Sequence, residues 1–189
     1  MGLAPTIPGV REAASTPFEF AAAADGIVDV LDEHGIEKAH VCGLSLGAMV
    51  ATQLAIDHPD RVASLVLSGS QIAPNPAMMA VQRGIIRLLP ERIATRFGFT
   101  RMGWLAVLRA VAEADFRPRL GDIDVPTLVL CGSRDVANLP AARRLAAALP
   151  QAELKIVHGA GHEWNTQFPE LFTEVIGAFH TARLARPTS

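Results

Sequence analysis

The chain has 189 residues, half of them apolar, and a formal net charge of −2, so it is long enough for one domain with a sizeable core. It has no basic run or aromatic platform of the kind that binds nucleic acid, and no apolar stretch as long as a membrane span. The N-terminal residues also lack a charged segment followed by an apolar leader. We therefore expect a cytoplasmic protein without a nucleic-acid or membrane partner.

Strand and helix patterns alternate along most of the chain. Residues 1–17 contain three prolines and are predicted to form a loop. Short apolar runs predict four strands, at 39–42, 62–68, 125–132 and 154–157. Longer runs with apolar residues at helical spacing predict helices at 18–34, 46–57, 139–149 and 169–184. This alternation predicts an α/β fold, a three-layer sandwich whose sheet is mostly parallel.

Residues 71–121 differ from the rest of the chain, because they show no strand pattern. They are rich in Met, Phe, Leu, Ile and Trp, with prolines and glycines between short helical pieces. We expect two or three helices packed as a small cap over one end of the sheet, inserted in a single domain that covers residues 1–189. The alternative is that they are ordinary crossover helices lying on a face of the sheet.

A Gly-x-Ser-x-Gly pattern lies at residues 43–47, between a predicted strand and a predicted helix. This context is typical of a nucleophile elbow, a sharp turn that strains Ser45 and exposes its hydroxyl. We expect strand and helix to pass so closely that neither Gly43 nor Gly47 can carry a Cβ. The N–H of Leu46, at the start of the helix, is the expected oxyanion donor. The alternative is a glycine-rich turn with an incidental serine.

Two further side chains follow predicted strands at their carboxyl ends, where ligands of a parallel sheet bind. Asp135 follows the strand at 125–132, and His162 follows the strand at 154–157. In this arrangement His162 takes the proton of Ser45 and Asp135 orients the imidazole. Separately, Asp135 could be a loop-capping aspartate and His162 a solvent-facing loop histidine. The order Ser, Asp, His favours a catalytic triad.

These segments resemble those of α/β-hydrolase-fold proteins from about Phe18 to the last helix. The resemblance rests on four segments, at residues 43–47, 58–62, 125–135 and 159–162. The most similar group contains 3-oxoadipate enol-lactonases, related small esterases and C–C bond hydrolases. The resemblance implies a serine hydrolase that cleaves an ester, lactone or related acyl bond through an acyl-enzyme, without a cofactor or metal.

The apolar residues of the expected cap predict an apolar pocket for a small, largely apolar acyl substrate. The expected substrate contacts are Leu44, Met78, Trp104 and Trp164. The alternatives are a catalytically weak or inactive truncated hydrolase that acts as a binding or interaction module, and acyl transfer to an acceptor other than water.

The region before the nucleophile strand departs from the family pattern. Family members have further strands there, and a His-Gly-type loop supplies a second oxyanion donor. Here the strand begins at residue 39 and no His-Gly pair precedes it. We therefore expect a truncated α/β-hydrolase fold whose strand at 39–43 is an edge, covered in a homo-oligomer.

The two cysteines each end a predicted strand. Cys42 and Cys131 would be separated by one intervening strand, which is too far for a disulfide. We expect both to be small buried apolar residues and not a disulfide or metal pair.

Overall fold

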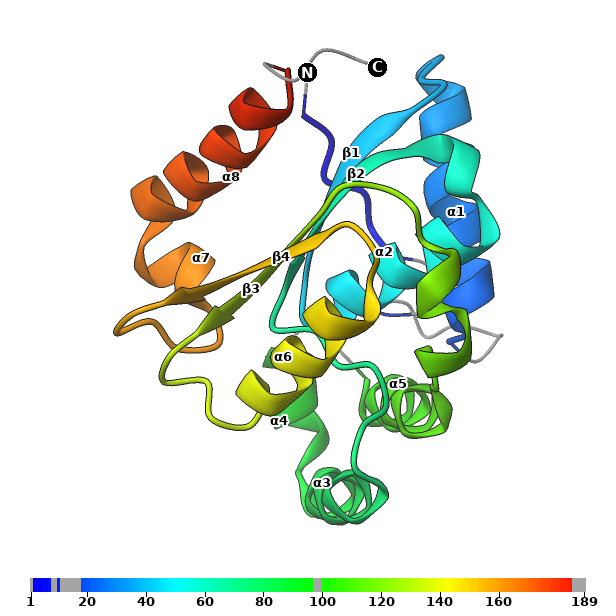
Figure 1. Cartoon of the computed structure of the whole chain (residues 1–189). Helices are drawn as coiled ribbons and strands as arrows, with labels where there is room; N and C mark the ends of the chain where they lie inside the picture. The colour runs from blue at the N-terminus through cyan, green and yellow to red at the C-terminus, as the bar shows by residue number, and fades with distance from the viewer. Residues whose placement is uncertain (1, 8–9, 11–17, 97–99, 185–189) are drawn as a thin grey trace.

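One parallel sheet of four strands forms the centre of the protein (Figure 1). The computed structural model describes residues 2–7, 10, 18–96 and 100–184. The strands are β1 (Ala39–Leu44), β2 (Val62–Ser68), β3 (Thr127–Gly132) and β4 (Ala152–Val157). They lie in the order β1-β2-β3-β4, and each pair of neighbours is parallel. Every connection is therefore a crossover that returns to the same end of the sheet.

Helices cover both faces of this sheet and make three layers (Figure 1). One face carries α1 (Phe20–Glu33), α2 (Leu46–Asp57) and α6 (Leu139–Ala148), and the other carries α7 (Trp164–Gln167) and α8 (Pro169–Leu184). Two short 3₁₀ helices, η1 (Pro59–Arg61) and η2 (Arg117–Asp122), precede β2 and β3. The predicted α/β sandwich is confirmed. The short helix α7 was not predicted.

The period-two alternation of the strands divides the core between the two faces. Leu65 and Leu67 of β2 belong to the cluster that includes residues of α1, α2 and α6. Val66 of β2 and Leu130 of β3 belong to the second cluster, with residues of α7 and α8. All four side chains are at most 1% exposed. Strands buried on both faces have continuous apolar sequences, which is why 65–67 and 128–131 have no polar residue.

Three helices lie between β2 and β3, beyond the carboxyl ends of the strands (Figure 1). They are α3 (Pro76–Leu88), α4 (Glu91–Arg96) and α5 (Arg101–Glu113). The Asn75 side chain caps α3 by accepting hydrogen bonds from the N–H groups of Ala77 and Met78, at 2.9 and 3.3 Å. α3 packs along α5. These helices lie at the end of the sheet where the loops after each strand also lie.

The two cysteines are both free, and their strands are separated by β2. Cys131 is buried as expected, but Cys42 is exposed, so the prediction for Cys42 is wrong. β1 is the end strand of the sheet, and its His40 and Cys42 side chains are exposed on one side while Val41 packs against the core on the other. An end strand has a neighbouring strand on one side only, which leaves part of its surface open.

The predicted loop at 1–17 is only partly described. Residues 2–7 form no strand, and Ile7 packs against the core. The remaining residues of that loop, apart from residue 10, lie outside the described residues. Among the described helices, none has the length and hydropathy needed to cross a bilayer.

Contact between α8 and β1 predicts a dependence of stability on pH. The rings of His180 and His40 lie 4.6 Å apart, and burial together with the neighbouring His40 lowers the pKa of His180 from 6.5. As the pH falls below 6.5, the unfolded chain binds a proton at this position more readily than the folded protein, so stability decreases. Urea denaturation at about pH 7.5 and about pH 5.5 should show this loss, and His180→Gln should reduce it.

His158→Gln is the matched control, because His158 is exposed and shows no such neighbour in the described structure. This variant should keep the wild-type pH dependence. An equal loss of stability in wild type and His180→Gln would contradict the prediction.

Candidate active site

Ser45 stands at the turn between β1 and α2 in a strained backbone conformation. Its φ is 54° and its ψ is −116°, and it is the one non-glycine residue with positive φ among those described. Its N–H donates to the carbonyl of Ser68 at the end of β2, at 2.8 Å. Its own carbonyl accepts from Ala48 and Met49 and so begins α2. The turn is therefore held from both sides, as a nucleophile elbow requires.

Only one of the two glycines around Ser45 is required by close packing. A Cβ on Gly43 would lie 2.3 Å from the carbonyl oxygen of Gly47 and 2.5 Å from the nitrogen of Ala48. A Cβ on Gly47 would meet no atom within 4 Å. The prediction is right for Gly43 and wrong for Gly47. A side chain on Gly43, at the end of β1, would collide with the backbone of α2, whereas a side chain on Gly47, within α2, would meet open space.

The N–H of Leu46, the expected oxyanion donor, lies at the N-terminus of α2 directly after Ser45. Leu46 is the first residue of α2, so its N–H has no intrahelical acceptor. The first backbone hydrogen bonds at this end come from Ala48 and Met49. An N–H at a helix N-terminus beside the serine can stabilise negative charge on a substrate oxygen.

Asp135 and His162 form a close pair. His162 Nδ1 lies 2.7 Å from Asp135 Oδ2, and the two side chains are 38% and 7% exposed. A carboxylate at this distance requires Nδ1 to carry the proton, which leaves Nε2 of a neutral imidazole as the acceptor. The pair can therefore accept a proton at Nε2 of a partly exposed side chain.

The loops that carry these two residues are joined by a close backbone approach. A Cβ on Gly132, at the end of β3, would lie 2.3 Å from the carbonyl oxygen of Ala160. The N–H of Arg134 donates to that same oxygen at 2.9 Å, and the N–H of Gly159 donates to Ser133 Oγ at 2.9 Å. These contacts hold the loop after β3 against the loop after β4, and so hold Asp135 beside His162.

The loop after β2 connects this pair to Ser45. Gly69 has a φ of +59°, and a Cβ on it would lie 2.9 Å from Cε1 of His162. The preceding residue, Ser68, accepts the hydrogen bond from Ser45 N–H. Ser45 and His162 therefore lie beside two consecutive residues, Ser68 at the end of β2 and Gly69 at the start of the loop that follows. Among the described residues no hydrogen bond joins Ser45 Oγ to the imidazole, and such bonds commonly tighten when substrate binds.

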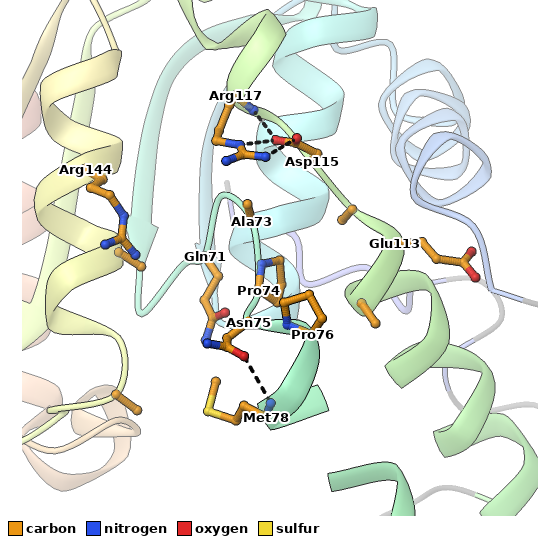
Figure 2. A pocket seen from close by; sticks show the side chains of 14 residues that line it. Gln71, Ala73, Pro74, Asn75, Pro76, Met78, Glu113, Asp115, Arg117 and Arg144 are labelled. Carbon is orange, nitrogen blue, oxygen red and sulfur yellow. Dashed lines mark hydrogen bonds and ion pairs between the residues drawn. The ribbon is translucent and has the colours of Figure 1, made fainter. Parts of the chain in front are cut away.

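A cavity of about 450 Å³ lies nearby, between the loop after β2, the end of α5 and the start of α6 (Figure 2). Gln71, Pro74 and Met78 contribute to its wall, and Ser45 and His162 do not. Four charged residues also line it: Glu113, Asp115, Arg117 and Arg144. The wall of this cavity is therefore mixed in polarity.

Asp115 and Arg117 neutralise each other at the edge of this cavity, where Figure 2 shows their hydrogen bonds. The hydrogen bonds from Arg117 lower the pKa of Asp115, and the carboxylate raises the pKa of Arg117. Arg144 extends from α6 toward the cavity (Figure 2).

The four expected substrate contacts have different environments. Trp164 is fully buried, and its Nε1 donates to Ser68 Oγ at 2.9 Å, so it supports the core and has no surface left for a substrate. That prediction is wrong, because α7 turns the indole inward against Phe172. Leu44 and Trp104 are half-buried, and Met78 is half-buried in the wall of the cavity.

Sequence reasoning missed Asn138, which contacts both Asp135 and His162. Asn is a common residue just before a helix, so its place in the sequence gives no signal of contacts with distant side chains. Among the described residues, no group of three or more His, Cys, Asp or Glu side chains is placed to hold a metal ion.

Comparison with known proteins identifies the family. The model of the alpha/beta hydrolase family matches residues 2–175. The chain belongs to the alpha/beta hydrolase family. This membership confirms the resemblance to α/β-hydrolase-fold proteins, and the chain is an enzyme of the hydrolase class.

This hydrolase is similar in sequence and structure to several hydrolases of the family. A Caulobacter vibrioides protein with the provisional name carbamate hydrolase RutD is 29% identical over 82% of this chain and 70% of its own length. A 3-oxoadipate enol-lactonase from Acinetobacter baylyi is 26% identical over 82% of this chain and 68% of its own. The solved enol-lactonase of Burkholderia xenovorans is 25% identical with a TM-score of 0.78, covering 90% of this chain and 76% of that one.

The close approach at the elbow of this hydrolase predicts a contrast between two glycine variants. Gly43→Ala should destabilise the fold by about 1–3 kcal/mol or more, because its methyl group would overlap the backbone of α2. Gly47→Ala, whose methyl group meets open space, should cost less than about 1 kcal/mol and serves as the matched control. Urea denaturation measures both, and equal losses would contradict the prediction.

Proposed function

We propose that the protein is a serine hydrolase that cleaves an ester, lactone or related acyl bond of a small, largely apolar substrate. The observation that carries this proposal is the 2.7 Å hydrogen bond between Asp135 and His162, with the His162 ring beside Gly69 and Ser45 hydrogen-bonded to the preceding residue, Ser68. The names of two relatives, an enol-lactonase and a carbamate hydrolase, describe cleavage of a bond at a carbonyl carbon. This supports the same class of bond for the present protein.

In the proposed reaction, Ser45 Oγ attacks the carbonyl carbon of the substrate and forms a C–O bond. His162 Nε2 accepts the hydroxyl proton, while Asp135 stabilises the imidazolium through Nδ1–H. The carbonyl oxygen becomes an oxyanion that the N–H of Leu46 stabilises. Collapse of this intermediate breaks the bond to the leaving group, which takes the proton from His162, and leaves an acyl-enzyme.

Hydrolysis of the acyl-enzyme repeats these steps with water as the nucleophile. His162 accepts a proton from the water, the hydroxide forms a bond to the acyl carbon, and Ser45 leaves with the proton returned by His162. The product is a carboxylic acid, and the enzyme is restored. Leu44, Met78 and Trp104, all half-buried, are the proposed contacts of the substrate.

A fluorophosphonate probe tests this proposal, because it bonds to an activated serine. We expect labelling of Ser45, located by mass spectrometry, and hydrolysis of a short-chain nitrophenyl ester. His162→Ala should lower the rate by about 10²–10⁴-fold, because the general base is lost. His158→Ala is the control, a loop histidine four residues away that is exposed, and it should keep the wild-type rate. Folded wild-type protein that is not labelled would contradict the proposal and favour a binding module.

We also propose that a second copy of the chain covers the outer edge of β1. Within the described residues β1 pairs only with β2, and residues 2–7 form no backbone hydrogen bond to it. An uncovered edge presents unpaired N–H and C=O groups to other strands. Two copies related by a two-fold axis would satisfy these groups by joining their β1 strands.

Light scattering after size-exclusion chromatography should show a species of twice the monomer mass at micromolar concentration. Cys42→Lys should shift this species toward monomer, because the exposed position on β1 would bring like charges together across the edge. Lys155→Glu on β4, at the opposite end of the sheet, should leave the dimer unchanged. A monomeric wild-type protein would refute the interface.

A further inference from the structure

Asn138 stands at the N-cap position of α6 but does not cap the helix. Asn is among the best N-cap residues, because its side-chain oxygen can accept from the N–H groups of the first turn. Here the Asn138 side chain makes no such hydrogen bond. By contrast, Asn75 caps α3 in the ordinary way. The amide of Asn138 is therefore engaged elsewhere.

The amide nitrogen of Asn138 contacts the acid–base pair. Its Nδ2 lies 2.9 Å from Asp135 Oδ1, 3.0 Å from Asp135 Oδ2 and 3.1 Å from His162 Nδ1. Because Nδ1 of His162 already donates to Asp135, the Asn138 amide donates its hydrogen bonds to the carboxylate and not to the imidazole. Counted as whole residues, Asn138 is 7% exposed and Asp135 is 8% exposed, so water has little access to this carboxylate.

Gln71 supports the direction in which the Asn138 amide faces. Gln71 Nε2 donates to Asn138 Oδ1 at 2.8 Å. The carboxylate of Asp135 only accepts hydrogen bonds, so the nitrogen of Asn138 must face it, and the oxygen then faces the Gln71 donor. A reversed Asn138 amide would place an oxygen against the carboxylate and lose the hydrogen bonds to Asp135. Gln71 also lines the cavity of about 450 Å³, so this chain of contacts extends from the cavity to His162.

We propose that Asn138 is a positioning residue for the Asp135–His162 pair, with its amide oxygen held by Gln71. This inference rests on the proposed function of that pair. The donor holds the buried carboxylate at the angle that receives Nδ1–H, and so keeps His162 in the tautomer whose Nε2 accepts a proton. Without the donor, the carboxylate has one protein partner fewer in a site where water has little access.

Nitrogen NMR of protein with ¹⁵N-labelled histidine tests this inference without requiring catalysis. The His162 signals are assigned by their loss in His162→Gln. Wild type should show the Nδ1–H tautomer, and Asn138→Ala should show a mixture of tautomers or a weaker Nδ1–H signal. Asn75→Ala is the matched control, because it removes a true helix cap and should lower stability without changing the His162 tautomer.

Two isosteric variants at Gln71 test the orientation argument. Gln71→Met removes the donor to Asn138 and should have the smaller effect. Gln71→Glu places an acceptor against Asn138 Oδ1 and favours the reversed amide, so it should disturb the His162 tautomer more. Gln71 is half-buried at the cavity wall, which leaves both variants room to fold.

Kinetics give the second readout. Asn138→Ala should lower kcat by roughly 10²-fold with KM nearly unchanged, because misplacement of a catalytic group affects the chemical step. Asn138→Asp should shift the acidic limb of the pH–rate profile to higher pH, because a second carboxylate favours the protonated imidazole.

The outcomes separate the two proposals. If wild type is not labelled at Ser45 but Asn138→Ala still changes the His162 tautomer, the proposed reaction fails and the positioning role stands. If folded Asn138→Ala and Gln71→Glu both keep the wild-type tautomer, the positioning role is refuted whatever the activity.

Discussion

The site depends on two places where the backbone passes closer than any side chain allows. At Gly43 the end of β1 contacts the first turn of α2, and at Gly132 the end of β3 contacts the loop at 160–161. The first approach sets the strained turn of Ser45, and the second brings the loop of Asp135 against the loop of His162. A methyl group at either place would push apart the segments that carry Ser45, Asp135 and His162.

A third close contact links these two assemblies. Gly69 lies against the His162 ring, and its neighbour Ser68 accepts a hydrogen bond from Ser45 N–H. The end of β2 and the loop that follows it therefore lie between Ser45 and the imidazole. Ser68 also accepts from Trp164 through its hydroxyl, which ties the same loop to the core under α7 and α8. The positions of Ser45 and His162 therefore follow from packing on both faces of the sheet.

The buried carboxylate of Asp135 explains why polar contacts continue beyond the Asp135–His162 pair. Burial of a charge is costly unless hydrogen bonds compensate it, and here an imidazole and an amide share that role. Networks of this kind are stable only when every member has a partner. Gln71 donates to the oxygen of Asn138 and also lines the cavity beside α3 and α5, so the network extends from His162 to the wall of that cavity.

The sequence by itself determined the α/β class, several element bounds and the chain order of Ser45, Asp135 and His162, because these depend on local spacing of apolar residues and on turn residues. For α2, β2 and α8 the predicted bounds equal the observed ones. Only the tertiary structure decided that Gly47 is spatially unconstrained, that Trp164 is core and that Asn138 serves the carboxylate. These properties depend on atoms from distant segments, and the sequence alone does not say which of them come within contact distance.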